Sequence, residues 1–213
     1  MSFLKTSDMR VGTAQPFPGG IAAGASLRTP CGLRRIEMVR PGDLVVTRDN
    51  GLQPVRRIWE RSVTAAEMAA ERSLAPICLQ PRALGPMLPA NRISLAPDQR
   101  FLVPGYRLEG QQDTAGCLVA ARDLAEPVEG AFLDMSAKRV RFFTILFDTH
   151  QVFCVDGLPV ESFLASASAI ARLDEGLRDD VLALFPELAT KPNAYAPAPY
   201  KVLNSVQYLP DRV

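Results

Sequence analysis

The chain has 213 residues, of which 47% are apolar, and its 24 basic residues balance 23 acidic ones. This length and apolar content suit one medium-sized globular domain with a sizeable core. The near-neutral charge, without runs of like charge, argues against nucleic acid and membrane surfaces as partners. No stretch reaches the roughly 20 apolar residues of a membrane helix, and the first residues lack the apolar core of a signal peptide, so we expect a cytoplasmic protein.

Four cysteines are widely separated along the chain: Cys31, Cys78, Cys117 and Cys154. There is no Cys-x-x-Cys pair, and the only histidine, His150, lies near Cys154. This spacing does not indicate a metal site, and isolated cysteines in a cytoplasmic chain are typical of small buried apolar residues. We expect no metal and no cofactor.

Strand and turn signals predict an all-β body. A turn at Pro41–Asp43 precedes the β-branched run Leu44–Thr47, and Asn50-Gly51 marks a tight hairpin before a strand at Val55–Trp59. The segments "NRISLAPDQRFLV" and "KRVRFFTILFDTHQVFCVDG" continue the pattern, and the second has an apolar run that suits a sheet interior.

Helix signals are confined to two segments, and a third segment is extended. Thr64 and Glu67 form a capping-box pattern ahead of a helix over Ala65–Leu74. The range Ala165–Phe185 has apolar residues at helical spacing, interrupted by Gly176. The sequence "ATKPNAYAPAPYK" is rich in Pro and Ala and predicts an extended tail that lies along the surface or projects from it.

The segment "GIAAGASLRTPCGLRRIEMVRPGDLVVTRDNGLQPVRRIW" resembles the opening of a Hint domain, the Hedgehog/intein-like autoprocessing fold, in its stand-alone bacterial form. That opening starts with Cys and an apolar residue and continues through Thr-Pro-x-Gly to a Pro-Gly-Asp turn. The chain matches it at Gly24, Leu27, Thr29-Pro30, Gly32 and Pro41-Gly42-Asp43. Two later segments, "ALGPMLPANRISLAPDQRFLV" and "FDTHQVFCVDGLPVESF", resemble the family's histidine-bearing segment and its last strands.

The resemblance implies both a fold and a division of the chain. The fold would be all-β, with twisted antiparallel strands, pseudo-two-fold symmetry and short peripheral helices. The Hint-like domain would take residues 20–188 and include the C-terminal helical segment. Residues 1–19 would form an N-terminal extension, and residues 189–213 the Pro/Ala-rich tail.

The chemistry of the family requires a nucleophile at the first residue, where a thiol attacks the preceding carbonyl and converts a peptide bond into a thioester. Gly20 takes that place and carries no nucleophile. The resemblance also puts Gln99 where the activating histidine would stand, and Ala96 where a hydroxyl residue would precede it. Glutamine forms hydrogen bonds but transfers no proton near neutral pH. These substitutions predict a degenerate active site.

The end of the domain also departs from the splicing pattern. Splicing members end with His-Asn, and here Glu161-Ser162 stand instead, so splicing is not expected. The pair Asn204-Ser205 resembles a splice junction only superficially, because Leu203 precedes it where an assisting histidine would be needed.

His150 has two interpretations. It resembles a histidine near the end of the fold in processing relatives, or it is a structural residue that lies in a strand connection and hydrogen-bonds to the backbone, which we favour. Asp98 and Asp148 are interpreted as turn or capping residues rather than as acids or bases. The pairs Arg34-Arg35 and Arg56-Arg57 are interpreted as solvated residues at a sheet edge.

Two functions follow from these residues. In the first, the chain is a Hint-fold module that has lost autoprocessing and acts as a binding or scaffold domain, with a vestigial cleft for a peptide or protein partner. In the second, it cleaves itself or transfers an acyl group through Cys31 or Cys154, assisted by His150. Cys31 is a weak candidate, because the chain from Gly20 to Cys31 spans up to about 36 Å when extended.

The resemblance implies a specific geometry, because the family brings its first residue, its histidine strand and its last strands together. Gly20 and Gln99 should face each other across one cleft, with His150 near its rim. If Gly20 is simply a deleted nucleophile, Gly20→Cys combined with Gln99→His should restore thiol-dependent cleavage before residue 20.

Overall fold

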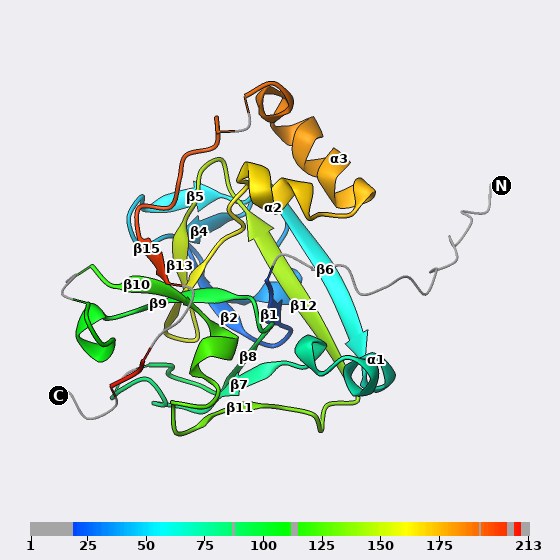
Figure 1. Cartoon of the computed structure of the whole chain (residues 1–213). Coiled ribbons are helices and arrows are strands. Elements are labelled where there is room, and N and C mark those ends of the chain that lie inside the picture. Colours follow the sequence, from blue (N-terminus) through cyan, green and yellow to red (C-terminus); the bar gives the residue numbers. More distant parts are fainter. Residues whose placement is uncertain (1–18, 87, 112–114, 192, 204–206, 210–213) are drawn as a thin grey trace.

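The computed structural model describes residues 19–86, 88–111, 115–191, 193–203 and 207–209. The strands of this part of the chain form a six-stranded sheet, a seven-stranded sheet and a two-stranded hairpin (Figure 1). The strand pairs between its named strands are antiparallel, except that β10 and β15 are parallel. The expected all-β body is confirmed.

The six-stranded sheet joins segments from both halves of the chain. Its order is β11 (Ala131–Leu133), β7 (Ile77–Leu79), β8 (Ile93–Leu95), β1 (Ile21–Ala22), β12 (Arg139–Leu146) and β6 (Arg57–Thr64). The long strands β6 and β12 form a ribbon that crosses the view diagonally in Figure 1. The short strand β1 lies between β8 and β12, which places the head of the domain inside this sheet.

The seven-stranded sheet combines the β2–β3 hairpin of the opening segment with strands of the later Hint-like segments. Its order is β15 (Lys201–Leu203), β10 (Cys117–Ala120), β9 (Arg100–Val103), β14 (Leu158–Glu161), β13 (Val152–Val155), β2 (Ser26–Thr29) and β3 (Gly32–Arg35). Strand β9 directly follows the turn that holds Gln99, and β14 ends at Glu161. Because β9 and β14 are neighbours, these two residues come close together.

The hairpin of β4 (Leu44–Val46) and β5 (Leu52–Pro54) follows the predicted Pro-Gly-Asp turn and contains Asn50-Gly51 at its tip. The predicted strand at Val55–Trp59 was wrong in its bounds. The partner strand is Leu52–Pro54, and the next strand, β6, begins at Arg57. Val55 still pairs with the first arm, donating to Asp43 O and accepting from Gly42 N–H, and the chain leaves the hairpin at Arg56, whose N–H donates to Leu146 O.

A buried apolar cluster joins the two large sheets. It includes Ile21 of β1, Leu27 of β2, Phe101 of β9 and Phe153 of β13, each at most 1% exposed. Burying side chains of this size contributes about 1.5–3 kcal/mol each. The core therefore fixes β1 and β9, the elements next to Gly20 and Gln99, in one rigid frame.

Helices lie at the periphery, as expected. Helix α1 (Ala65–Ala70) begins with the predicted capping box of Thr64 and Glu67, and a 3-10 turn follows at Arg72–Leu74. The other short 3-10 turns are Ile36–Met38, Gly105–Arg107, Ala121–Leu124 and Pro186–Ala189.

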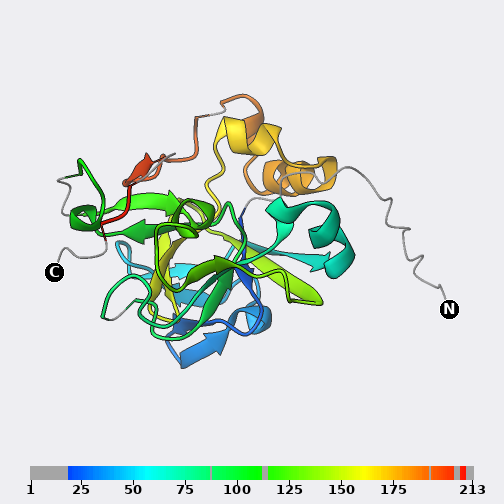
Figure 2. The ribbon, with the colours of Figure 1, turned by 60° about the horizontal axis from the view of Figure 1, so that its bottom comes forward.

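The second helical segment consists of α2 (Ala167–Ala171) and α3 (Glu175–Leu184). The break lies at Asp174, not at Gly176, because the Asp174 side chain accepts a hydrogen bond from Leu177 N–H and starts α3, so that Gly176 is helical. The two helices pack on Trp59 and Leu146 outside the main core. Figure 2 shows them on the side of the molecule opposite the blue β2–β3 hairpin.

The described part of the tail packs against the body. The Tyr195 hydroxyl donates a hydrogen bond to Phe147 O at 3.0 Å, and β15 adds a strand beside β10. Tyr208 is buried and forms a bridge with Leu108. The Asn204-Ser205 pair lies outside the described residues.

Candidate functional site

The Gly19–Gly20 peptide bond lies at the predicted head of the domain. Gly20 N–H donates to Gln99 Oε1 at 2.8 Å, and Ala96 N–H donates to Gly20 O at 2.8 Å. On the other side, the buried Thr144 hydroxyl lies 3.4 Å from Gly19 O and donates to it. The expected proximity of Gly20 and Gln99 is confirmed, and Ala96 lies beside them.

The space at Gly20 admits no side chain. Its φ is +146°, and an added Cβ would lie 2.8 Å from Phe142 Cβ and 3.6 Å from Thr144 Oγ1. A contact of 2.8 Å between two carbons lies well inside the distance at which they attract. Because any residue other than glycine at position 142 has a Cβ at that place, a cysteine at position 20 requires the backbone to move. The sequence-based expectation that two substitutions suffice to restore cleavage is thereby revised.

Gln99 is 5% exposed and uses both ends of its amide. Its Oε1 accepts from Gly20, while its Nε2 donates to Arg100 O at 2.8 Å and to Glu161 O at 2.9 Å. The side chain thus joins the head of the domain to its last Hint-like strand.

Glu161 lies in a buried cluster of charged groups. Its two carboxylate oxygens accept hydrogen bonds from Arg100 Nε at 2.5 Å and Nη2 at 2.6 Å. His150 Nε2 lies 3.3 Å from Glu161 Oε1. The side chains of His150 and Glu161 are 1% and 4% exposed, and that of Arg100 is 29% exposed. Two basic side chains therefore converge on one carboxylate.

This cluster corrects two expectations for His150: its place near the rim of the cleft and its hydrogen bond to the backbone. Its side chain is buried and does not lie at a rim. It does lie in the connection between β12 and β13, as predicted, but its contact is with the Glu161 carboxylate, and neither ring nitrogen has a hydrogen-bond partner among the described residues. Ser162 is also buried, and its hydroxyl accepts a hydrogen bond from Gln151 N–H at 3.0 Å.

The alternative nucleophiles lie elsewhere. Cys31 is exposed at the tip of the β2–β3 hairpin, and Cys154 is exposed on β13, whereas Cys78 and Cys117 are buried. The expectation of burial was wrong for the two exposed thiols. Desolvation raises the pKa of Cys154 despite the nearby Arg28 and Arg48, so its thiolate is disfavoured.

The candidate acids have structural ion pairs. Asp98 pairs with Arg122, and Asp148 with Arg56 at 3.2 Å. The arginines at the sheet edges are partly neutralised, since Arg34 pairs with Asp43 at 2.6 Å. Arg34 and Arg35 lie in β3, the outer strand of the seven-stranded sheet, as expected.

Gly19 lines two cavities. One, of about 830 Å³, is bordered by β6, the turn after α1, β7, β11, β12 and the 3-10 turn Ala121–Leu124. The other, of about 230 Å³, includes Gln99, Arg100, Glu161 and Ser162 in its wall. We call the larger one the Gly19 cleft. The peptide bond before Gly20 therefore lies beside a space large enough for a ligand.

Sequence reasoning missed three residues of this site: Arg100, Phe142 and Thr144. Phe142 and Thr144 are two apart in β12 and so share one face of that strand, the face that meets Gly20. Alternation along the strand was a signal that could have paired them. The partner of Arg100 has no local signal, because Glu161 lies 61 residues away.

Comparison with known proteins identifies the family. Residues 20–167 match the Hint domain, and the chain belongs to the Hint domain family. No curated protein matches the chain.

Solved structures with a similar arrangement include the bacterial intein-like domain from Clostridium thermocellum, with 18% identity, a TM-score of 0.42, and coverage of 67% of this chain and 97% of that one. The MchDnaB-1 intein has 11% identity, a TM-score of 0.43, and coverage of 67% and 98%. A DnaB intein from Synechocystis sp. PCC 6803 has 10% identity, a TM-score of 0.42, and coverage of 68% and 98%.

Two further features concern only the described part of the chain. It contains no group of three or more His, Cys, Asp or Glu side chains arranged to hold a metal ion. None of its helices is long and apolar enough to cross a membrane.

Proposed function

We propose that this Hint domain has a degenerate active site, does not process itself, and serves as a binding or scaffold domain whose Gly19 cleft receives a peptide or loop of a partner protein. One observation carries the proposal. Position 20 has no nucleophile, and Phe142 leaves no room for one, because an added Cβ would lie 2.8 Å from its Cβ. Without that nucleophile the first step of autoprocessing, thioester formation, has no attacking atom.

The groups around position 20 support the same proposal. Gln99 holds Gly20 N–H and Glu161 O in fixed hydrogen bonds, and it has no proton to transfer near neutral pH. The Glu161 carboxylate accepts hydrogen bonds from Arg100 and lies 3.3 Å from His150 Nε2. These residues hold the Gly19–Gly20 peptide in place, which suits a scaffold rather than a site that breaks this bond.

The thiols support a setting in the cytoplasm, and the resemblance to stand-alone Hint domains suggests a bacterial protein. Cys31 and Cys154 are free and exposed. Exposed free thiols persist in reducing compartments and are oxidised outside them. We therefore place the binding function inside the cell.

The test is the intact mass of the purified full chain, followed for several days with and without dithiothreitol or hydroxylamine. We expect the bond between Gly19 and Gly20 to stay intact in all samples. Hydroxylamine also traps a thioester as a hydroxamate, so it detects even a slow first step. A fragment that begins at residue 20, or residues 1–19 carrying a hydroxamate, would overturn the proposal, whereas a fragment that begins at Gly51 comes from the cleavage of Asn50-Gly51 by hydroxylamine.

A further inference from the structure

The Gly19 cleft has an apolar floor. Val63, Leu74, Ile77, Leu133 and Phe142 line it, and they come from five different elements of the fold. Its volume of about 830 Å³ lies within the usual range of ligand pockets, about 300–1,000 Å³. The floor favours the apolar part of a bound group and does not by itself select a charge.

Asp123 supplies a charge in the wall. It lies in the 3-10 turn Ala121–Leu124 and lines both cavities beside Gly19. Its Oδ2 is buried and has no hydrogen-bond partner among the described residues. Its Oδ1 lies 3.7 Å from Arg122 Nε, and Arg122 is also paired with Asp98. An acceptor without a donor is unfavourable, so a ligand donor that reaches this carboxylate, whose side chain is 19% exposed, would be favourable.

Counted together with Asp123, the charges of the cleft wall favour a cation over an anion by one unit. Its wall contains four carboxylates, those of Glu71, Asp98, Asp123 and Glu126, and three arginines, Arg61, Arg72 and Arg122. Desolvation raises the pKa of Asp123, and Arg122 opposes this only in part. A cationic donor placed at Oδ2 would favour the charged form of the carboxylate.

We propose that the Gly19 cleft binds an extended peptide segment through a lysine or arginine whose aliphatic stem lies on the apolar floor and whose charged head donates to Asp123. Such side chains combine an apolar stem with a cationic end, which matches a floor of this kind beside one unpaired carboxylate oxygen. This inference rests on the proposed binding function and names the class of peptide that the cleft selects.

The test uses two synthetic probes, Ac-Gly-Phe-Lys-Phe-Gly-NH₂ and the same peptide with norleucine in place of lysine. Norleucine keeps the stem and removes the charge. Affinities are measured by calorimetry on the full chain, and the site is located by amide shifts in ¹⁵N-labelled protein. We expect the lysine probe to bind at least tenfold more tightly and to shift amides in the Ala121–Leu124 turn and in β11.

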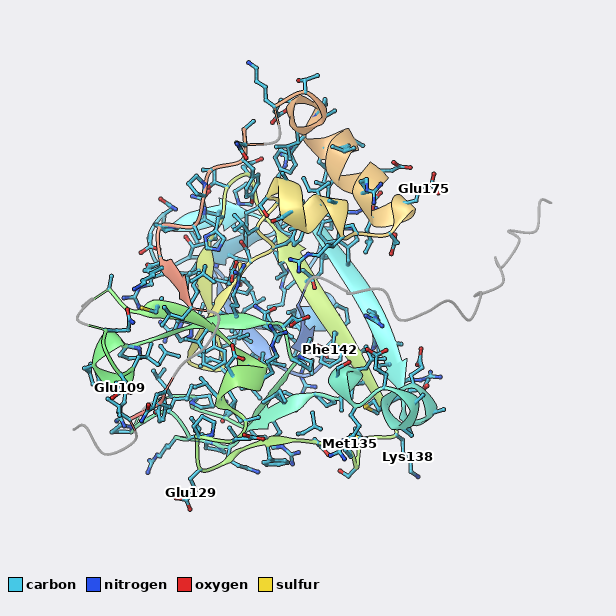
Figure 3. All side chains as sticks on the ribbon, viewed as in Figure 1. Glu109, Glu129, Met135, Lys138, Phe142 and Glu175 are labelled. Carbon is cyan, nitrogen blue, oxygen red and sulfur yellow. The ribbon has the colours of Figure 1, made fainter. Side chains whose placement is uncertain are left out.

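Asp123→Asn should remove that tenfold preference, while Glu175→Gln, on α3, should leave the affinity within twofold. Figure 3 shows Glu175 on the outer helix, away from Phe142 in the wall of the cleft. Equal binding of both probes, shifts confined to other faces, or no binding at millimolar probe would overturn the inference. The lysine and norleucine comparison on the unmodified chain decides this even if Asp123→Asn does not fold. Failure here leaves the intact-mass result unchanged, so the proposed function is judged separately.

Discussion

The head and the end of the Hint domain meet at one place but are built from different interactions. Around Gly20 the contacts are neutral: main-chain groups, an amide, a hydroxyl and the ring of Phe142. Around Glu161 the main contact is ionic, a two-point pair with Arg100, and His150 Nε2 lies 3.3 Å from the same buried carboxylate. The residues allowed at the head are therefore limited by space, and those at the end by charge. Stability should respond to added volume at Gly20 and to removed charge at Glu161.

The largest expected effect is at the charged end. Glu161→Gln keeps the shape but leaves Arg100 without its counter-charge, and breaking such a buried pair should lower the free energy of unfolding by about 2–4 kcal/mol. Glu60→Gln is the matched control, because Glu60 forms a similar two-point pair with Arg141 that is 42% and 45% exposed. There the loss should stay below about 1 kcal/mol. Urea unfolding measures both, and equal losses would show that burial does not matter to the Glu161 cluster.

The next effect is the difference between two glycine variants, and it tests the space at the head. Gly20→Ala places a Cβ 2.8 Å from Phe142, whereas Gly24→Ala meets no atom within 4 Å, although both glycines have a positive φ, +146° and +92°. Backbone strain should cost about 1–2 kcal/mol at either position, and the overlap should add about 1–3 kcal/mol at Gly20 only. The difference in unfolding free energy between the two variants measures the overlap. If Gly24→Ala is the more harmful one, the packing argument is wrong.

The head and the end of the domain differ in how much of their structure could be predicted from the sequence. Turn residues at Pro41–Asp43 and Asn50-Gly51 predicted the hairpin from local signals, whereas the resemblance to Hint domains implied the fold and the proximity of Gly20 to Gln99. The ion pair of Arg100 with Glu161 and the approach of Phe142 to Gly20 depend on pairing between strands far apart in the chain. No short-range pattern records such distances, so the charged network and the filled space could not be predicted.

The helical segment shows the same limit on a smaller scale. Helical spacing predicted the range of α2 and α3, but the boundary was set by Asp174, whose side chain caps α3. The contact that fixes α3 to the body joins Asp180 to Arg57 and Trp59, more than a hundred residues earlier. Local patterns therefore gave the helices without giving their attachment.

A smaller effect should come from this attachment, which is ionic like the Glu161 cluster but more exposed. Burial alone would raise the pKa of Asp180, but hydrogen bonds from Trp59 and Arg57 outweigh it and hold the pKa below its ordinary value. The folded-state pKa is thus lower than the unfolded one, about 3.9, so this stabilisation is present above that pH and is lost as the pH falls through the folded-state value.

The chain has one tryptophan, Trp59, whose fluorescence reports on this contact between pH 5 and 2. Because the Asp180 side chain is 36% exposed, the loss should stay below about 1 kcal/mol. Asp180→Asn should remove this part of the acid response of the fluorescence. An unchanged response in that variant would assign it to other carboxyl groups.

The last prediction concerns cleavage, and the expected result for the double variant is that none occurs. It tests whether the lack of space at position 20 prevents cleavage even when the missing side chains are supplied. Gly20→Cys with Gln99→His supplies the thiol and the histidine, yet the new Cβ would still overlap Phe142 Cβ, so we expect the full mass to persist with thiol present. Phe142→Ala would not help, since alanine keeps that Cβ, whereas adding Phe142→Gly opens the space and should give a fragment that begins at residue 20. Removing a buried ring costs about 3–5 kcal/mol of stability. Circular dichroism is therefore used to check that each variant is folded. Cleavage in the double variant would mean that the backbone at Gly20 yields easily, and that the missing nucleophile and histidine, not the lack of space, had silenced the site.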